Sequence, residues 1–596
     1  MDQAALYHRP DSEMAFIYTR NEYHIYLRTK HGDVAQVKLL FGDPYDFEFD
    51  EKGQRKWNYQ EVAMIKDAET LNHDYWKLAI NIPQRRLQYA FWVEGKDGEQ
   101  VIYDDRRIMP YNEQNLARMD CFIVPFVHLS DEKWAPNWVR QTVWYQLFAD
   151  RFANGNVKND PPATLPWGDQ AVHPNACFGG DLAGLIKRLD YLKDLGVNGI
   201  YLMPIFTAYS STKFDTVDYF SIDPSLGTKA EFKQLVDELH KRNMRIMLDG
   251  VFSYMSDTSL QWQDVQEKGR ASRFADWFQI RRFPVGYKPT DNPDIAYDLT
   301  YNVHGNNPHM PQLNTANPAV RKYLLGVAAY WTREFNIDGW HLEYAAEVDQ
   351  KFWREFATTV REINPEIYLV GEVKHSNQRI VQPGKLDGVV NYPVTEAITR
   401  FAANKELSVA ELISVINDQM ALYRDQTNEV MFNAVESHVT QRLLATCHGD
   451  SSLVRMILAL TFLQIGTPSL FYGTEVGMTN QQAPRIYQSM IWDEDKQDKK
   501  MLRFVKVLTH FRRNFAKLLS YGDFQWGPRS NKYNYLSLTR QLGKHQVFAL
   551  FNFGYTAIKF VRPQNSRIIL SQNLLDHEEK IGSNGFLIIE LTTQGE

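Results

Sequence analysis

The pattern of hydrophobic and polar residues divides the chain into three parts. Over residues 1–125 apolar and polar positions alternate in short runs, and turns rich in Gly and Asp separate those runs. The clearest runs are 24–27, 37–41, 76–80 and 88–93. Alternation of this kind is typical of strands with one buried face. We therefore predict an N-terminal β-sandwich over residues 1–125, followed by a linker up to about residue 138.

Between about residues 140 and 515 the pattern changes, and buried apolar runs alternate with stretches of helical periodicity. Helices are predicted over residues 181–195, 229–242 and 319–335. Eight apolar runs are predicted as strands: 142–148, 199–204, 245–249, 339–344, 367–372, 388–392, 431–434 and 469–472. Strands that alternate with helices form a parallel sheet, and eight such units close into a (β/α)8 barrel.

Two further stretches complete the predicted architecture. Residues 253–311 lose the barrel rhythm, and we interpret them as an insertion over the barrel mouth, because loops of that length are usually functional. From about residue 520 to residue 596 strand-like alternation returns and predicts a C-terminal β-sandwich. The uncharged window 456–474 is long enough for a membrane span, but Gly466, Thr467 and Pro468 interrupt it. A buried helix, a turn and a buried strand are expected there instead.

Composition narrows the classes of function. The net charge of -6 and the pI near 6.3 give no electrostatic reason to expect nucleic-acid binding. Cys121, Cys177 and Cys447 lie far apart, which argues against a disulfide framework or a zinc site. The segment from Met1 lacks a basic stretch followed by an apolar run, so no signal peptide is expected. We expect a soluble, cytoplasmic protein without membrane association.

Three carboxylates, Asp249, Glu343 and Glu372, lie at the ends of predicted strands. A parallel barrel brings the carboxyl ends of its strands to one mouth, so these groups are expected to lie together. Glycoside hydrolysis needs two such groups, because one protonates the leaving oxygen while the other attacks or activates water. Any barrel gathers charge at this face, so convergence without a shared function is the alternative on this evidence alone.

Several longer stretches carry a family resemblance: residues 144–152 (WYQLFADRF), 178–182 (FGGDL), 310–315 (MPQLNT), 391–393 (NYP) and 466–468 (GTP). With them, nearly the whole chain resembles the α-amylase superfamily, glycoside hydrolase family 13. It looks most like the neopullulanase, cyclomaltodextrinase and maltogenic-amylase group. The resemblance implies two β-sandwiches flanking a barrel with an inserted domain. It also implies retaining chemistry on α-1,4 and α-1,6 glucans, with an Asp nucleophile, a Glu acid/base and a second Asp that grips sugar hydroxyls.

Part of the family pattern is kept. The resemblance places Glu372 at the acid/base position and Asp249 at the Asp of the third strand. It also matches Asp218 to the Asp of an Asp-Thr-x-Asp-Tyr stretch, and His438 to the His near the seventh strand. Two further residues are expected at substrate-binding positions: Glu347 and Asn391.

Other positions depart from that pattern. Glu343 stands where the family has its nucleophilic Asp, and His341 replaces the Arg that pairs with that nucleophile. Val439 stands in place of the second, sugar-gripping Asp. Tyr254 replaces a His and Phe214 replaces a stacking Tyr, and we retain both as expected substrate contacts. The remaining replacements are Ser211, Thr212, Ser253, Ala346 and Lys374.

These departures predict damaged catalysis. One extra methylene moves the oxygens of Glu343 by roughly 1.5 Å, and a displacement near 1 Å can cost about a hundredfold in rate. His341 cannot offer the bidentate fork of an Arg, and Val439 cannot hydrogen-bond a sugar. We predict weak or no hydrolysis and a role in binding α-glucan or a partner. The alternatives are an active retaining hydrolase, with Glu343 as nucleophile and Glu372 as acid/base, or a shifted activity such as glycosyl transfer.

The resemblance also suggests partners. Related proteins bind Ca²⁺ through loop carbonyls and Asn or Asp side chains, so Ca²⁺ is allowed although no cofactor is required. Relatives use the N-terminal domain to cover the barrel mouth of a neighbour. We therefore expect α-glucan oligosaccharides as ligands, and a homodimer or a heterodimer with a related amylase.

Overall fold

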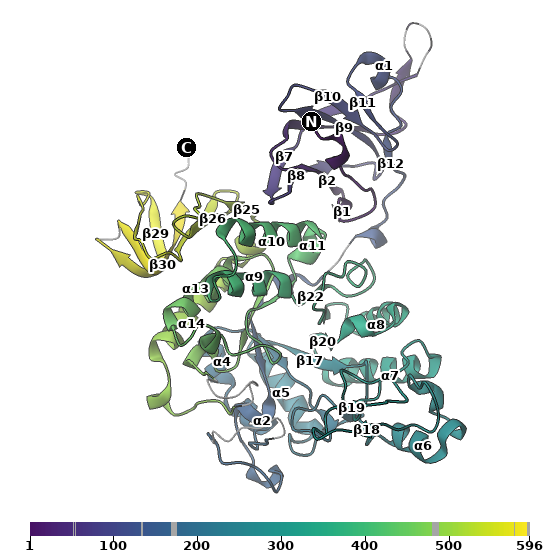
Figure 1. Ribbon diagram of the computed structural model, residues 1–596, viewed down its shortest axis with the longest axis vertical. Helices are drawn as coiled ribbons and strands as arrows, with labels where there is room; N and C mark the ends of the chain where they lie inside the picture. Colours follow the sequence, from purple (N-terminus) through teal and green to yellow (C-terminus); the bar gives the residue numbers. More distant parts are fainter. Residues whose placement is uncertain are drawn as a thin grey trace.

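Three parts follow one another along the chain in the computed structural model, which describes residues 1–49, 51, 53, 55–132, 135–168, 176–479, 488–576 and 579–592. The N-terminal β domain (purple in Figure 1) lies at one end of the molecule, and the barrel and the C-terminal sheet (yellow) lie side by side at the other. Within these ranges every helix is too short or too polar to cross a membrane.

The N-terminal domain is a sandwich of two antiparallel sheets, as predicted. One sheet has the order β1 (Ala15–Thr19), β2 (Glu22–Lys30), β8 (His73–Asn81), β7 (Ile65–Glu69). The other runs β11 (Ile108–Pro110), β10 (Gln100–Tyr103), β9 (Leu87–Gly95), β3 (Val34–Gly42), β6 (Gln60–Ala63), and β12 (Phe122–Val124) pairs with β9. Ile25 and Leu27 of the first sheet share a core with Val37, Leu39 and Phe91 of the second. The short strands β4 (Phe47–Phe49) and β5 (Arg55–Trp57) form a separate hairpin.

Eight parallel strands form the barrel, and each of the eight predicted runs overlaps one of them. They are β13 (Trp144–Leu147), β14 (Gly199–Leu202), β17 (Arg245–Val251), β20 (Gly339–Glu343), β21 (Tyr368–Gly371), β22 (Gly388–Val389), β23 (Phe432–Ala434) and β24 (Thr467–Phe471). A parallel bridge between Val390 and Phe432 connects the two ends of the sheet into a ring. Barrel strands are buried on both faces, by the helices outside and by the barrel interior inside. Their sequences are therefore continuous apolar runs, and this pattern predicted the strands.

Amphipathic helices surround the ring: α3 (Leu182–Lys187), α4 (Leu189–Leu195), α5 (Lys229–Lys241), α7 (Pro318–Phe335), α8 (Gln350–Ile363), α9 (Tyr392–Ala402), α10 (Val409–Ala421), α11 (Asp425–Asn428), α13 (Ser451–Leu463), α14 (Lys499–Asn514) and α15 (Ala516–Tyr521). The single helix predicted over 181–195 is wrong in one respect, because the chain leaves helical geometry at Arg188 (φ -103°, ψ 6°) and divides it into α3 and α4. The predicted interruption of the 456–474 window is confirmed at Gly466, whereas Thr467 and Pro468 already belong to the strand β24 (Thr467–Phe471). Gly466 has φ 108° between α13 and β24.

The loops at the carboxyl ends of β14 and β17 carry most of the additional structure. A hairpin of β15 (Phe206–Ala208) and β16 (Thr216–Ile222) follows β14. The segment between β17 and α7 contains α6 (Leu260–Lys268), β18 (Lys288–Pro289) and β19 (Ala296–Tyr297). An antiparallel bridge between Tyr254 and Gln312 ties the end of this insertion to its start. The insertion therefore stands over the mouth of the barrel, as expected.

The expected C-terminal β domain is present, and its strands join in one antiparallel sheet rather than in two stacked sheets. The order is β25 (Asp523–Trp526), β26 (Tyr535–Leu542), β27 (His545–Asn552), β30 (Lys580–Thr592), β28 (Ile558–Lys559), and β29 (Ser566–Leu575) also pairs with β30. Leu538, Phe551 and Ile588 belong to the same core as the barrel and its helices. Helices, not a second sheet, thus provide the opposing layer on this face.

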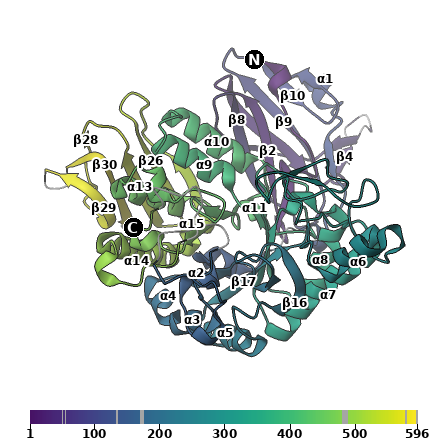
Figure 2. The ribbon, with the colours of Figure 1, turned by 60° about the horizontal axis from the view of Figure 1, so that its bottom comes forward.

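Ionic hydrogen bonds attach the N-terminal domain to α11, just before β23. Asp425 of α11 lies 2.6 Å from His24 Nδ1 and 2.8 Å from Lys77 Nζ, and it accepts a hydrogen bond from the Tyr26 hydroxyl at 2.9 Å. A cavity of about 450 Å³ remains at this junction. Figure 2 shows the N-terminal domain beside α10 and α11. Because α11 precedes β23, the domain docks at the amino ends of the strands, on the side away from its own barrel mouth.

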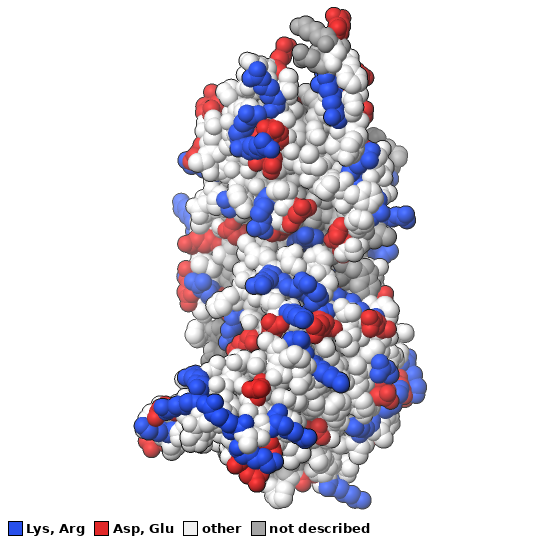
Figure 3. Space-filling view, turned by 90° about the vertical axis from the view of Figure 1, so that its right-hand side faces the viewer, with Lys and Arg blue, Asp and Glu red and all other residues white. Residues whose placement is uncertain are grey.

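The surface carries both signs of charge. Figure 3 shows acidic and basic side chains interspersed over one face of the molecule. This pattern suits a chain whose net charge is only -6.

Substitution of Asp425 by Asn should loosen the N-terminal domain. Burial opposes ionisation of Asp425, but Lys77 and His24 outweigh it and hold the pKa of this carboxyl well below its usual range. We expect a loss of about 2–3 kcal/mol at pH 7, below the 3–5 kcal/mol of fully buried pairs, because about a fifth of each side chain contacts solvent. A depressed pKa stabilises the fold above the ordinary Asp pKa of about 3.9, so the difference from wild type should shrink as the pH falls below about 4. Urea unfolding across pH 3–8 measures this.

Asp418→Asn is the matched control on α10. Asp418 accepts hydrogen bonds from Tyr75 and Ser414 in the same interface but has no cationic partner among the described residues. Its loss should stay below about 1 kcal/mol. Equal losses for the two variants at every pH would contradict an ionic attachment.

Candidate active site

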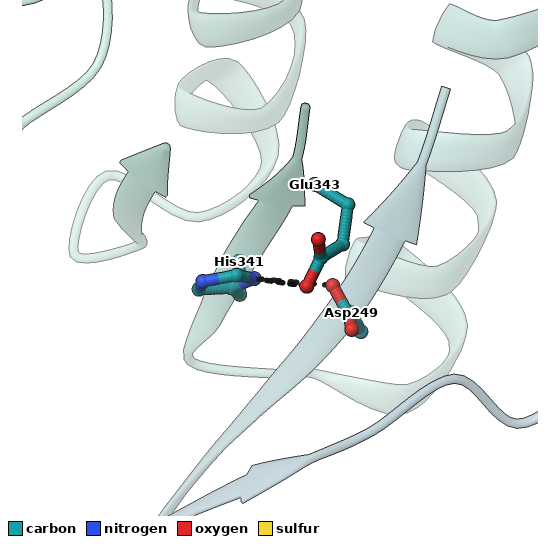
Figure 4. A group of neighbouring side chains, drawn as sticks. All are labelled: Asp249, His341 and Glu343. Atoms are coloured by element: carbon teal, nitrogen blue, oxygen red, sulfur yellow. Dashed lines mark hydrogen bonds and ion pairs between the residues drawn. The ribbon is translucent and has the colours of Figure 1, made fainter. Parts of the chain in front are cut away.

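Three carboxylates meet at the carboxyl ends of neighbouring barrel strands. Asp249 lies in β17, Glu343 is the last residue of β20, and Glu372 follows β21 directly. These strands are adjacent and parallel, so their exits share one edge of the ring. Figure 4 shows the side chains of Asp249, His341 and Glu343 pointing toward one another from β17 and β20. The predicted convergence is confirmed.

The register of β17 and β20 explains the contact between Asp249 and His341. These two residues are direct partners in the parallel ladder, and His341 and Glu343 share a face because they are two residues apart. His341 Nδ1 lies 3.1 Å from Asp249 Oδ1 and 3.6 Å from Glu343 Oε1. The hydroxyl of Tyr201 on β14 joins this group, 2.8 Å from His341 Nδ1 and 3.1 Å from Asp249 Oδ2.

Glu343 also contacts a second group on its other side. His438 Nε2 lies 3.3 Å from Glu343 Oε1, and one ligand atom each of Glu343, Glu372 and His438 lies within 4.8 Å of the others. Glu343 and Glu372 therefore lie close together, and Tyr392 donates its hydroxyl to Glu372 Oε1 at 2.8 Å. Glu343 is therefore shared between a group with Asp249 and a group with Glu372.

The cluster is almost completely enclosed. Relative exposure is 0% for Glu343, 1% for Asp249, 2% for His341 and 3% for Glu372. Among the described residues, the ion pairs that these three carboxylates form involve only His341 and His438. Three acidic groups thus occupy a dry volume without a Lys or Arg partner in the described part of the chain.

Burial sets the protonation of this cluster. It raises the pKa of Glu343 well above its usual value, and the nearby Glu372 and Asp249 add to the effect. Burial also raises the pKa of Asp249, against the influence of His341. It would raise the pKa of Glu372, but the hydrogen bond from Glu343 and the neighbouring His438 and His341 lower that pKa to about 2. Glu343 therefore holds the shared proton and Glu372 is ionised.

Aromatic rings cover the cluster. The ring of Tyr254, which follows β17, stacks on His304 of the insertion at 4.8 Å between centroids and 22° between planes. His304 in turn contacts Tyr344, whose centroid lies 3.9 Å away. Phe214 stacks on His438 at 5.2 Å and 23°. Segments after three different strands therefore combine to close the mouth above Glu343.

Tyr344 has an unusual backbone. It follows Glu343 with φ 49° and ψ 42°, in the left-handed region that a bulky residue rarely occupies. Such strain persists only where the surroundings impose it, and it is concentrated at functional sites. Here it ends β20 abruptly and turns the Tyr344 ring toward His304.

The remaining predicted residues lie in different surroundings. Asp218 stays outside the cluster, because its carboxylate accepts hydrogen bonds from Phe220 N and the Ser221 hydroxyl on its own strand. Asn391 is buried, and its side-chain amide donates a hydrogen bond to Asn433 Oδ1 at 2.9 Å. Glu347 is exposed, with an oxygen 3.8 Å from His304 Nδ1. Val439 is 38% exposed and presents only methyl groups at the rim.

Three contributors were missed by the sequence reading: Tyr201, His304 and Tyr392. Tyr201 lies inside a predicted strand and Tyr392 inside the quoted 391–393 stretch, so both positions were recognisable as barrel interior. His304 had no local signal, because the insertion lacks periodicity and only the fold brings it over β20.

A second polar cluster lies in the loop after β13. Its Asp and Asn side chains could bind a metal ion only through oxygen atoms. Asp160 and Asp181 accept hydrogen bonds from Asn154 Nδ2 (2.9 Å) and Asn159 Nδ2 (3.3 Å), respectively. The side-chain oxygens of both Asn residues are buried without a hydrogen-bond partner among the described residues. Gly179 packs so closely that a Cβ there would lie 2.4 Å from Asp160 Oδ1. Unpaired oxygens beside two carboxylates suit a hard cation such as Ca²⁺.

Comparison with known proteins assigns the family. The family pattern described as the α-amylase catalytic domain matches residues 146–515, and the α-amylase N-terminal Ig-like domain matches residues 1–128. The chain belongs to the α-amylase family. It is 42% identical to an intracellular maltogenic amylase of Bacillus subtilis (strain 168) over 555 residues, covering 93% of this chain and 92% of that protein.

Other members of the α-amylase family match over the full length. A cyclomaltodextrinase of Geobacillus thermopakistaniensis is 39% identical over 598 residues, covering 100% of this chain and 98% of the relative. A solved cyclomaltodextrinase structure superposes with a TM-score of 0.89 at 34% identity, covering 99% of this chain and 100% of that one. All three domains are therefore shared with these relatives, and both names denote enzymes.

Glu343→Gln should stabilise this family member. The pKa of Glu343 in the folded protein is raised above the ordinary Glu value of about 4.3. Its protonated side chain therefore stabilises the fold below about pH 4.3, and this stabilisation is lost as the pH rises toward the folded pKa. Gln cannot ionise, so the gain in free energy of unfolding should grow from about zero at pH 5 to about 1–2 kcal/mol at pH 8. Thermal unfolding in buffers containing EDTA measures it.

Asp338→Asn is the comparison for this prediction. Asp338 is also a buried carboxylate, but Arg245 (2.7 Å) and His240 (2.8 Å) pair with it. Its substitution should destabilise the protein at pH 8. A loss for Glu343→Gln as large as that for Asp338→Asn would show that Glu343 is a well-compensated charge.

Proposed function

We propose that this chain is an α-glucan-related member of its family with weak or no hydrolysis, and that it acts by binding glucan or a partner protein. The observation that carries the proposal is the contact between Glu343 and Glu372 inside an enclosed cluster. A retaining glycosidase holds its two carboxyl groups about 5–5.5 Å apart, with the sugar carbon between them. Here one oxygen of Glu343 and one of Glu372 lie within 4.8 Å of each other, which is less than that separation.

The protonation of Glu343 and Glu372 also supports weak or no hydrolysis. Retaining hydrolysis needs an ionised nucleophile and a protonated acid. At the corresponding positions Glu343 holds the proton and Glu372 is ionised, which is the reverse arrangement. A sugar would have to separate the two groups and move the proton before the reaction could begin.

The replaced side chains supply no substitute for the lost contacts. His341 is occupied by Asp249 and Tyr201, so it offers no two-pronged cationic partner to a nucleophile. Val439 cannot hydrogen-bond a sugar hydroxyl. The stack of Tyr254, His304 and Tyr344 fills the space beside Glu343. Each missing transition-state contact typically costs about 10²–10³ in rate.

The choice of α-glucan as ligand rests on the relatives and on the rim of the mouth. Similar proteins are named as cyclomaltodextrinase and maltogenic amylase. The half-buried rings of Phe214 and Tyr344 offer faces on which a sugar can stack. An active hydrolase with Glu343 as nucleophile remains the competing proposal, and it would require the aromatic cover to open.

Restoring the family residues should restore hydrolysis. The set is His341→Arg, Glu343→Asp and Val439→Asp, with Tyr254→His added to open the aromatic cover. The introduced guanidinium and carboxylate would pair with each other, which limits the cost of burying them. We expect the repaired protein to hydrolyse maltotriose at least about a thousandfold faster than wild type, from two regained contacts discounted for non-additivity.

The control for this series is Glu372→Gln in the repaired protein, which should abolish the gained activity. Circular dichroism on each variant confirms folding. If the folded, repaired protein is no faster than wild type, the replaced residues are not what limits hydrolysis.

We also propose that the oxygen cluster after β13 binds Ca²⁺, with Asn154, Asn159, Asp160 and Asp181 as the residues that would hold it. The unpaired Asn oxygens support this assignment. A bound ion would tie the loop to the start of α3, because Asp181 caps that helix. Chelation by EGTA should lower the melting temperature, and Asp160→Asn should remove most of that effect. No shift in the wild-type protein would contradict the assignment.

We also propose that the protein forms a dimer and is located in the cytoplasm. The N-terminal domain docks away from its own barrel mouth and exposes Tyr45 (68%) and Phe49 (69%) near the β4–β5 hairpin. Exposed aromatic groups of this kind suit a protein interface. Light scattering at tens of micromolar should give twice the chain mass of 69.4 kDa. A monomeric mass would contradict a homodimer, and a mixture with a related amylase tests the heterodimer.

A further inference from the structure

Three buried polar atoms in the barrel mouth lack hydrogen-bond partners among the described residues: Glu343 Oε2, Glu372 Oε2 and His438 Nε2. Their side chains are 0%, 3% and 6% exposed. Folded proteins pair almost every buried polar group, so three unpaired atoms in one place require an explanation. The separations already described, within 4.8 Å, show that they belong to one small space.

A sugar does not explain this space. A glucosyl unit needs room between the two carboxyl groups, whereas one oxygen of Glu343 and one of Glu372 lie within 4.8 Å of each other and the aromatic stack covers them. A single ion is small enough for the space that is present. The two carboxylates and one imidazole also belong to different chemical types, so this is not simply a cluster of acids.

We propose that Glu343, Glu372 and His438 form a binding site for a divalent first-row transition metal ion such as Zn²⁺ or Co²⁺. This inference rests on the arrangement of the side chains and not on whether the protein hydrolyses glucan. The proposed ligands occupy positions to which the family resemblance assigns a role in sugar binding or hydrolysis.

The spacing of the ligands suits such an ion. Metal–ligand bonds to imidazole nitrogen and carboxylate oxygen are about 2.0–2.2 Å, so neighbouring ligands of one ion lie roughly 3–3.6 Å apart. His438 Nε2 and Glu343 Oε1 are 3.3 Å apart. Imidazole combined with carboxylate favours Zn²⁺, Co²⁺, Mn²⁺ or Fe²⁺ over Ca²⁺, which takes oxygen ligands only.

Charge supports the same site. Asp249, Glu343 and Glu372 share an enclosed volume, and His341 stands where the family has an Arg. Among the described residues no Lys or Arg forms an ion pair with these carboxylates. A divalent cation would supply positive charge to this enclosed group.

Neighbouring groups orient the proposed ligands, as the outer partners of metal sites do. Tyr392 holds Glu372 from one side, and Tyr201 lies 3.3 Å from Glu343 Oε1. The amide of Gln146 contacts His438 Nδ1 at 3.0 Å, and its own Oε1 has no partner among the described residues. Rotation of this amide by half a turn would let Oε1 accept Nδ1–H. His438 Nε2 would then be unprotonated and free to bind metal.

The test is titration of EDTA-treated, full-length protein with Zn²⁺ by calorimetry, and with Co²⁺ by visible absorption. We expect one tight site per chain and a Co²⁺ spectrum with bands from an imidazole-containing site. His438→Gln and Glu372→Gln should each weaken Zn²⁺ binding by at least about 100-fold, and Tyr201→Phe should weaken it by about 10–100-fold. His309→Gln is the matched control, because the exposed pair His309–Asp257 (2.6 Å) is the kind of surface site that binds Zn²⁺ adventitiously.

The outcomes are separable. Loss of the tight site in His438→Gln but not in His309→Gln supports the proposal. No tight site in wild type, or loss only in His309→Gln, overturns it. A Co²⁺ titration of the wild-type protein that gives only the weak visible bands of six-coordinate aqueous Co²⁺ would also overturn it, even if a variant fails to fold. Turnover measured in EDTA tests the proposed function separately, because that assay contains no free metal.

Discussion

The structure depends on one constraint, which is that Asp249, Glu343 and Glu372 must share a buried volume at the barrel mouth with no Lys or Arg among the described residues to neutralise them. Charged groups in such surroundings need a partner, a proton or an ion. Here burial and the nearby Glu372 raise the pKa of Glu343, so that it keeps a proton. His341 and Tyr201 contact Asp249. The same need for compensation is the basis of the proposed function and of the inferred metal site.

The scaffold itself is not eroded. His341 and Glu343 lie in β20, yet the eight-strand ring is complete and Asp425 attaches the N-terminal domain. The chain also matches a cyclomaltodextrinase structure over nearly its full length. Barrel cores and mouths are built from different residues, since the strands supply packing and the loops after them supply chemistry. His341 and Val439 can therefore differ from the family pattern without a change of fold, and the proposed function concerns only what they do at the mouth.

Much of this was readable from the sequence. The barrel strands are continuous apolar runs, and a parallel ring has only one edge for their carboxyl ends, so the meeting of Asp249, Glu343 and Glu372 followed from chain order. Asp218 as a substrate contact stays a prediction, since its carboxylate lies outside the cluster and accepts hydrogen bonds from its own strand. The positions of His304 and Tyr344 depend on an aperiodic insertion and on a left-handed backbone residue, neither of which has a local sequence pattern. The break at Arg188 and the single C-terminal sheet were likewise set by packing.

The turnover number of the unmodified protein on maltotriose, cyclodextrin and pullulan tests the central claim most directly. A site in which the nucleophile position is protonated and lies against the acid/base should turn over about a thousandfold below the typical enzyme value of about 10 s⁻¹, at or below roughly 10⁻² s⁻¹. A value of about 1–10³ s⁻¹ on any of these substrates would contradict the account. Glu343 would then be a working nucleophile, and the closed cluster would be a resting state that substrate opens.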